Sequence, residues 1–105
     1  MATITDPVLS RFGTALDEVY GERIERVVLF GSRARGDAQP DSDYDIAVFL
    51  RRPDELWSEL GRLSHITTDI LNDTGAVISA KPFPAGAYSK SSPLMREIRA
   101  DGLDL

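Results

Sequence analysis

The chain has 105 residues, a net charge of −5, a pI near 4.7 and no cysteine. This length suits one compact domain, so we expect a single domain spanning residues 1–105. The acidic charge argues against direct nucleic-acid binding, and the lack of cysteine excludes disulfides and thiolate metal sites. No apolar run reaches the roughly 18 residues of a membrane span and no apolar leader is visible, so we expect a cytoplasmic protein without membrane contact.

The first half of the chain predicts a helix and then a strand. After a loose start at residues 1–5, Asp6-Pro7 opens a helix over residues 7–20, because Asp is a good N-cap and Pro is favoured at the first helical position. Apolar residues recur there at spacings of three and four, which predicts one buried face, and Gly21 ends the helix. A strand is expected over residues 24–30, because its continuous apolar half, residues 27–30, is typical of a strand in the middle of a sheet.

The middle of the chain predicts a turn and a second strand. Residues 33–36 favour a short helical turn, and residues 37–42 form a polar loop. The second strand is expected over residues 43–50, with Asp43 and Asp45 on one face and the alternate residues facing the core.

The second half predicts a long helix, a strand and a short helix. The long helix is expected to begin at Pro53 or Asp54, to carry an apolar stripe and to close at residues 72–75. We expect a third strand over residues 76–80, stopped by Pro82, and then a loop to residue 92. A last helix is expected over residues 93–100, capped by Gly102. These elements predict an α/β (α+β) fold with a small mixed β-sheet and helices packed mainly on one face.

Two chemical features lie between the first two strands. Gly31-Ser32 follows a strand and begins a helical turn, which leaves free backbone N–H groups pointing at one spot, as suits a phosphate. Asp43 and Asp45 lie two residues apart in a strand, so both carboxylates share a face, about 7 Å apart along the chain. Such a pair repels unless a cation lies between them, and carboxylates plus substrate phosphates are the usual ligands of Mg²⁺. Together they predict metal-assisted phosphoryl or nucleotidyl transfer.

The pattern Gly-Ser-x-Ala-Arg-Gly-x5-Ser-Asp-x-Asp, from Gly31 to Asp45, resembles the signature of the minimal nucleotidyltransferases. These proteins belong to the polymerase-β-like nucleotidyltransferase superfamily, so the resemblance implies a palm-like nucleotidyltransferase fold. The closing pattern Pro-Leu-x-x-x-Ile-x-x-x-Gly-x-x-Leu and the length fit the same family.

The resemblance implies that this chain binds ATP with Mg²⁺ and moves AMP onto a hydroxyl. The residues that match are catalytic and metal-binding Asp43 and Asp45, and phosphate-binding Gly31, Ser32, Arg35 and Ser42. From the residues alone, Arg35 has two open roles, contact with the phosphates or pairing with the aspartates when no metal is bound.

The superfamily commonly uses a third carboxylate on a later strand, and this sequence has none there. Val77 or Ser79 occupies the place, depending on register, while Asp69 or Asp73 would have to reach in from the preceding helix. His65 is expected at the surface or the boundary of that helix rather than in catalysis, and Trp57 is expected in the core.

Two functions from different classes follow from the resemblance. The first is an MntA-type antitoxin that attaches AMP to a tyrosine of a HEPN-type toxin partner; the acidic charge fits a protein partner better than RNA. The alternative is a catalytically impaired module that binds and masks such a partner without chemistry. A third, antibiotic modification, is disfavoured because those enzymes usually carry an additional helical domain.

Overall fold

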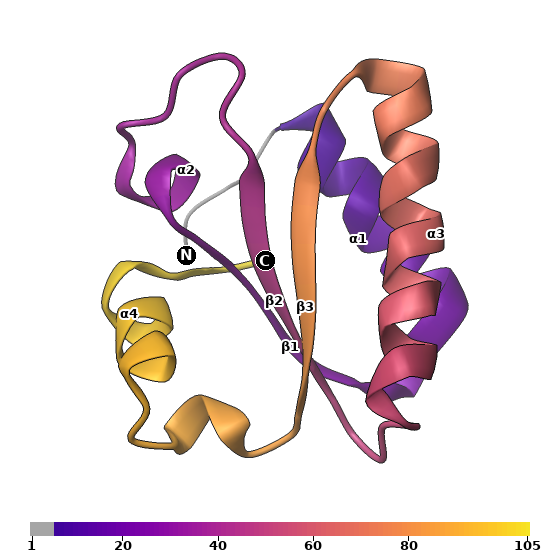
Figure 1. Cartoon of the computed structure of the whole chain (residues 1–105), viewed down its shortest axis with the longest axis vertical. Helices are drawn as coiled ribbons and strands as arrows, with labels where there is room; N and C mark the ends of the chain where they lie inside the picture. The colour runs from indigo at the N-terminus through magenta and orange to yellow at the C-terminus, as the bar shows by residue number, and fades with distance from the viewer. Residues whose placement is uncertain (1–5) are drawn as a thin grey trace.

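The computed structural model describes residues 6–105, so the start expected to be loose, residues 1–5, lies outside the described residues. The chain forms one mixed sheet with helices on both of its faces (Figure 1). None of the helices among residues 6–105 has an apolar stretch long enough to cross a bilayer. In chain order, the elements are α1 (Pro7–Tyr20), the 3₁₀ helix η1 (Gly21–Arg23), β1 (Ile24–Phe30), α2 (Ser32–Arg35), β2 (Tyr44–Leu50), α3 (Leu56–Thr74), β3 (Ile78–Pro84), the 3₁₀ helix η2 (Ala87–Ser89), α4 (Pro93–Asp101) and β4 (Leu103–Asp104).

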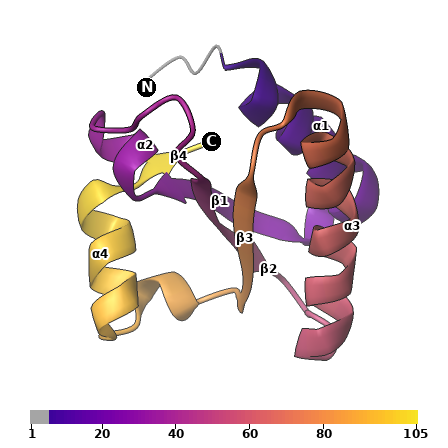
Figure 2. The ribbon, with the colours of Figure 1, turned by 45° about the horizontal axis from the view of Figure 1, so that its top comes forward.

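The strand order across the sheet is β3-β2-β1-β4. β1 pairs antiparallel with β2 and with β4, while β2 and β3 run parallel. α1 and α3 lie on one side of the sheet and α4 lies on the other, as the two views agree (Figures 1 and 2). The predicted α/β class with a mixed sheet is therefore confirmed, and the two long helices share one face as expected.

The larger hydrophobic core lies between the sheet and the two long helices. Alternate residues of β2 face it, because side chains along a strand point to opposite faces in turn. The helices contribute stripes at spacings of three and four, which confirms the amphipathic pattern of the sequence. The buried residues of this core are Leu9, Phe12, Leu16, Tyr20, Leu29, Tyr44, Ile46, Val48, Leu50, Leu63, Ile66, Ile70 and Ile78.

A smaller core lies on the opposite face of the sheet, under α4. Its buried residues are Val28, Phe30, Ala47, Phe49, Met95 and Ile98. Ala47 and Phe49 follow Asp45 at spacings of two, so Asp45 lies on the face that α4 covers. The short last helix therefore closes the sheet beside the predicted site.

The predicted opening of α1 is confirmed, and it is hydrogen-bonded to β2, the strand that carries Asp45. Asp6 Oδ1 accepts a hydrogen bond from the Val8 N–H at 2.8 Å, which caps the helix. Asp6 Oδ2 accepts a hydrogen bond from the Tyr44 hydroxyl at 2.7 Å. Gly21, with φ 54°, ends the helix as expected.

The third strand differs from its prediction. It begins at Ile78 rather than at residue 76, and it continues through Pro82, which was expected to stop it. β3 lies at the edge of the sheet, so proline nitrogens can face outward without breaking the ladder. The Ala85 N–H still donates to the Leu50 carbonyl at 2.8 Å, so pairing with β2 continues past the prolines.

The start of α3 also differs from its prediction. The helix begins at Leu56, because Arg52 has a positive φ of 50° and the Asp54 N–H donates to a side chain rather than entering the helix. Trp57 was expected in the core, but 80% of its surface is exposed. Trp57 lies about two and a half turns before the buried Ile66, which places it on the opposite side of the helix.

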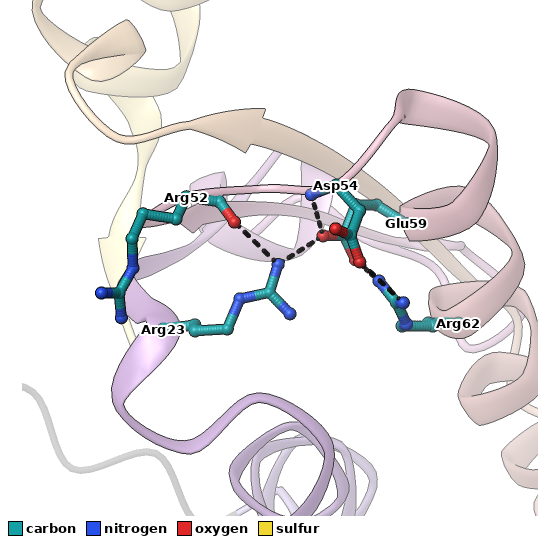
Figure 3. Close-up of polar contacts among 5 residues, drawn as sticks. All are labelled: Arg23, Arg52, Asp54, Glu59 and Arg62. Atoms are coloured by element: carbon teal, nitrogen blue, oxygen red, sulfur yellow. Dashed lines mark hydrogen bonds and ion pairs between the residues drawn. The ribbon is translucent and has the colours of Figure 1, made fainter.

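A buried carboxylate, Glu59, occupies the core-facing position near the start of α3 (Figure 3). Its Oε2 accepts hydrogen bonds from Arg23 Nη2 at 2.6 Å and from the Asp54 N–H at 2.9 Å. Its Oε1 accepts a hydrogen bond from Arg62 Nη1 at 2.8 Å. Arg23 Nη2 also donates to the Arg52 carbonyl at 3.2 Å. The cluster therefore joins the α1–β1 connection, the β2–α3 loop and α3.

The sequence did not predict the two-residue strand β4. Gly102, which precedes this strand, ends α4 as predicted and also allows a close backbone contact. Gly102 does end α4, and its N–H donates to the Ile98 carbonyl at 2.9 Å. Its φ of −69° is ordinary, but a Cβ there would lie 2.2 Å from the Ile98 carbonyl oxygen and 2.5 Å from a Val28 methyl carbon. A side chain at this position would therefore push β4 away from β1.

We expect Gly102→Ala to lower the free energy of unfolding by about 1–3 kcal/mol, because the added methyl group overpacks a backbone contact that cannot move aside. Urea denaturation measures this change. Gly61→Ala in α3 is the matched control, since a Cβ at Gly61 meets nothing within 4 Å, and it should be neutral or slightly stabilising. Equal stability of the two variants would contradict the close contact at Gly102.

Candidate functional site

The turn after β1 lies where the sequence predicted it, and its short helix spans Ser32–Arg35 rather than residues 33–36. β1 ends at Phe30, Gly31 takes φ 75° and ψ −158°, and Ser32 begins the short helix α2. The Gly31 carbonyl accepts hydrogen bonds from the Ala34 and Arg35 N–H groups, each at 3.1 Å. These bonds close a tight turn directly after the strand.

Gly31 has a second role that the sequence did not reveal. Phe30 is the register partner of Asp45 on β2, so the turn lies beside this carboxylate. A Cβ at Gly31 would lie 2.4 Å from Asp45 Oδ2. Only glycine therefore lets the Asp45 carboxylate rest against the turn that is predicted to hold phosphate.

The two aspartates differ in burial. Asp45 lies in β2 and is half-buried, whereas Asp43 lies one residue before the strand and is exposed. The second strand was expected to include Asp43, so that boundary was wrong by one residue. Burial raises the pKa of Asp45, and the nearby charges of Asp43 and Glu97 raise it further, while Lys81 and Arg35 oppose the shift. A bound cation would favour the ionised form, so metal and proton compete at this carboxylate.

The β2–β3 register identifies the residue at the place of the third carboxylate. Asp45 pairs with Ser79, so Ser79 rather than Val77 lies beside it. Asp73 Oδ2 lies 2.6 Å from Arg11 Nη2 on α1, and Asp69 lies 3.9 Å from His65 along α3. Within residues 6–105, no group of three or more acidic, histidine or cysteine side chains is placed to hold a metal ion.

The donor set at Asp43 and Asp45 fits a hard divalent cation. Two carboxylates supply oxygen ligands, and the remaining positions would be filled by water and by the phosphates of a nucleotide, which is the usual arrangement for Mg²⁺. This fit supports the predicted metal-binding role of Asp43 and Asp45, which stays a prediction.

The remaining predicted phosphate ligands, Ser42 and Arg35, have other partners in this structure. The Ser42 hydroxyl accepts a hydrogen bond from the Gln39 N–H at 2.9 Å, which shapes the loop before Asp43. Arg35 pairs with Asp37 at 3.3 Å and with Asp101 of α4 at 3.4 Å. Both acids raise the pKa of Arg35, and Asp37 has the larger effect. Arg35 therefore pairs with Asp37 and Asp101 rather than with Asp43 or Asp45.

Arg33 holds the loop that leads to the aspartates. Its Nε donates to the Ser42 carbonyl at 2.9 Å, and its Nη2 donates to the Pro40 carbonyl at 3.2 Å. The guanidinium also lies 3.9 Å from the centre of the Tyr44 ring. Arg33 therefore holds this loop in place, a role that the sequence did not predict.

Two features at the rim of the site were not found from the sequence. Lys81 on β3 and Glu97 on α4 both lie close enough to Asp45 to affect its pKa. Alternation along β3 would have placed Lys81 on the face of Asp45, but only if the parallel register had been known. His65, in contrast, is exposed as predicted and lies on α3, away from the aspartates.

The comparison with protein families gives the class of this protein. Residues 9–91 match the family described as "Nucleotidyltransferase domain". The chain therefore belongs to this nucleotidyltransferase family, which confirms the resemblance and the enzyme class predicted from the motif. Enzymes of this kind typically use a divalent metal ion.

Curated relatives match less than half of the chain. Two candidate protein adenylyltransferases of Methanocaldococcus jannaschii are 42% identical over 43 residues and 32% identical over 44 residues. The matches span 41% and 42% of this chain, and 43% and 44% of those proteins. The aligned region thus covers less than half of each relative.

Solved structures share the fold over most of the chain. A candidate nucleotidyltransferase from Sulfolobus solfataricus has a TM-score of 0.66 at 19% identity, covering 92% of this chain and 75% of that one. A toxin–antitoxin structure with AMP-PNP has a TM-score of 0.63 at 18% identity, covering 90% and 69%. A toxin–antitoxin MntA–HpeT mutant has a TM-score of 0.61 at 16% identity, with the same coverage. These likenesses confirm the nucleotidyltransferase fold.

Proposed function

We propose that this protein is a Mg²⁺-dependent adenylyltransferase that binds ATP and transfers AMP to a hydroxyl group of a protein partner. The observation that carries the proposal is the contact between Gly31 and Asp45. It brings a carboxylate against a strand-to-helix turn, within a family of nucleotidyltransferases. Phosphate-binding backbone and a metal-binding acid are thereby joined at one point.

The chain's own residues would divide the work as follows. Gly31 and Ser32 orient the triphosphate, with Ser42 and Arg35 beside it, and Asp43 and Asp45 hold the cation. When bound, Mg²⁺ supplies positive charge to the phosphates and orients them. The acceptor oxygen bonds to the α-phosphorus, the bond from that phosphorus to the bridging oxygen breaks, pyrophosphate leaves, and the hydroxyl proton passes to solvent. A positioned base typically contributes about 10²–10⁴-fold, so Ser79 in place of a third acid predicts slow transfer.

The partner that we propose is a HEPN-type toxin, with a tyrosine as the acceptor. Toxin–antitoxin structures share this fold, one of them with the ATP analogue AMP-PNP, and relatives are named as candidate protein adenylyltransferases. The net charge of −5 suits a protein partner better than a nucleic acid. A phenol tolerates the missing base better than an aliphatic hydroxyl because it loses its proton more readily. We place the reaction in the cytoplasm.

A masking module without chemistry is the alternative. It is favoured because, among residues 6–105, no third acidic side chain joins Asp43 and Asp45 in a group that could hold a metal ion. In that case the protein would bind and silence the same partner, and nucleotide binding would be a remnant. The two functions differ in whether the partner gains mass.

The experiment is intact-mass spectrometry of a candidate HEPN partner after incubation with this protein, ATP and Mg²⁺. We expect the partner to gain one or more AMP units, and we expect the Asp43→Ala, Asp45→Ala double variant to add none. Peptide mapping would then identify the acceptor. Asp41→Ala, in the variable five-residue stretch of the motif, is the matched control that should keep activity.

An unchanged partner mass would overturn transfer if the two proteins still form a stable complex, and the masking module would then be the better account. Mass gain that persists in the double variant would show that the aspartates are not the catalytic pair.

A further inference from the structure

Lys81 lies on the same sheet face as the predicted catalytic pair. The parallel register pairs Asp45 with Ser79 and Ala47 with Lys81, and paired residues of neighbouring strands project to the same face. One pair further on, Phe49 and Phe83 stack with ring centres 5.4 Å apart, so the shared face continues past Lys81. Lys81 is thus the diagonal neighbour of Asp45, a spacing that a long side chain spans.

Lys81 also differs from the other cations at this site, because among residues 6–105 its side chain has neither an ion-pair nor a hydrogen-bond partner. Arg33 is committed to backbone carbonyls of the loop, and Arg35 pairs with Asp37 and Asp101. Among residues 6–105, no carboxylate oxygen lies within 4 Å of the Lys81 amino group, and the side chain is exposed. Its charge is therefore available to a ligand.

The site needs such a charge when a nucleotide binds. Asp43 and Asp45 are the two acids of the motif, Ser79 is neutral, and Glu97 adds a further negative charge from α4. A triphosphate brought to these acids meets repulsion that one divalent cation offsets only in part. A lysine ammonium is a mobile point charge well suited to phosphate oxygens.

We propose that Lys81 contacts the triphosphate of the bound nucleotide, and that its ammonium group supplies positive charge at a metal site built from only two carboxylates. Lys81 is then a nucleotide-binding residue on β3, beside the place where a third acid would lie. The inference rests on the proposed function, because it requires that a nucleotide binds at this site.

The chain offers a direct test because Lys81 and Lys90 are its only two lysines. Both side chains are exposed. Lys90 lies between η2 and α4, beyond the C-terminal end of β3. We would acetylate the protein briefly, with and without AMP-PNP and Mg²⁺, and quantify each lysine by peptide mass spectrometry. We expect the analogue to protect Lys81 severalfold and to leave Lys90 unchanged, and we expect no protection in the Asp43→Ala, Asp45→Ala variant.

Nucleotide affinity, measured by equilibrium dialysis of the same samples, separates the possible failures. If the analogue binds and Lys81 stays as reactive as before, the role of Lys81 is wrong while nucleotide binding stands. If the analogue does not bind the wild-type protein, the proposed function fails and the role of Lys81 falls with it.

Variants give a second readout that does not depend on transfer. Lys81→Met should weaken AMP-PNP binding by about tenfold or more, as expected for the loss of a charged hydrogen bond. Lys81→Arg should restore part of it, and Lys90→Met, which changes the net charge equally, should have little effect. Thermal midpoints should stay near wild type in all three, because both lysines are exposed. Wild-type affinity in Lys81→Met would overturn the proposal.

Discussion

Replacing Glu59 with glutamine is expected to lower the free energy of unfolding by about 3–5 kcal/mol, the usual cost of breaking a buried ion pair. Only 1% of the Glu59 surface is exposed, and its carboxylate accepts hydrogen bonds from Arg23, Arg62 and the Asp54 N–H. Glutamine keeps the volume of the side chain but removes the charge and replaces one acceptor oxygen with a donor. The Arg23 guanidinium would then lose its buried counter-ion. Urea denaturation at pH 7 measures the change.

The pH dependence of stability gives an independent check on the Glu59 cluster. Burial by itself raises the pKa of Glu59, but the hydrogen bonds from Asp54, Arg62 and Arg23 outweigh it and lower the pKa from 4.5 to about 2. A carboxyl group whose pKa is lower in the folded state stabilises the protein at pH values above its unfolded-state pKa. This contribution is lost as the pH falls from 4.5 towards 2. The shift corresponds to about 3 kcal/mol. Glu59→Gln should flatten this part of the stability curve.

The matched control for Glu59 is Glu55→Gln, an exposed glutamate one turn earlier on the chain. It should leave stability within about 0.5 kcal/mol of wild type, as surface changes usually do. Equal denaturation midpoints for the two variants would show that the cluster contributes nothing net.

Local patterns predicted those parts of the fold that depend on neighbours in the chain. The opening of α1 at Asp6-Pro7 followed from capping chemistry, and the turn at Gly31 followed from a glycine between a strand and a polar segment. The prediction for Trp57 was wrong because it treated every apolar residue of α3 as part of one stripe, although helical spacing places Trp57 opposite the buried Ile66. Glu59 lies on the apolar stripe of α3, but a charged residue is predicted at the surface unless its partners are known. Its three hydrogen-bond donors come together only in the folded structure.

The sequence predicts a chemistry for the candidate site, but it did not predict the residues that surround the site. The spacing from Gly31 to Asp45 identified the predicted phosphate and metal residues. The neighbours Ser79, Lys81 and Glu97 come from β3 and α4, whose placement depends on a parallel register and on which face α4 covers. Neither is fixed by local sequence, and Pro82 suggested that the strand carrying Lys81 had already ended.

Gly31→Ala is expected to reduce Mg²⁺-dependent nucleotide binding by about 100-fold while the protein still folds. The backbone at Gly31, with φ 75° and ψ −158°, is a conformation that is essentially restricted to glycine, so the substitution should cost about 1–3 kcal/mol of stability. The new methyl carbon would lie 2.4 Å from Asp45 Oδ2, so the carboxylate must turn away. Loss of a charged contact costs about 1.5–3 kcal/mol, which corresponds to up to about 100-fold in affinity. Equilibrium dialysis with AMP-PNP and Mg²⁺ measures binding, and circular dichroism confirms folding.

Gly36→Ala separates backbone strain from loss of the site. Gly36 also has a positive φ, 86°, but a Cβ there meets nothing within 4 Å. This variant should lose stability through strain alone and keep nucleotide affinity near wild type. If both variants lose affinity to the same extent, the turn as a whole matters and the specific contact with Asp45 does not. If Gly31→Ala alone loses it, the missing side chain at Gly31 is what allows a carboxylate and a phosphate-binding turn to meet.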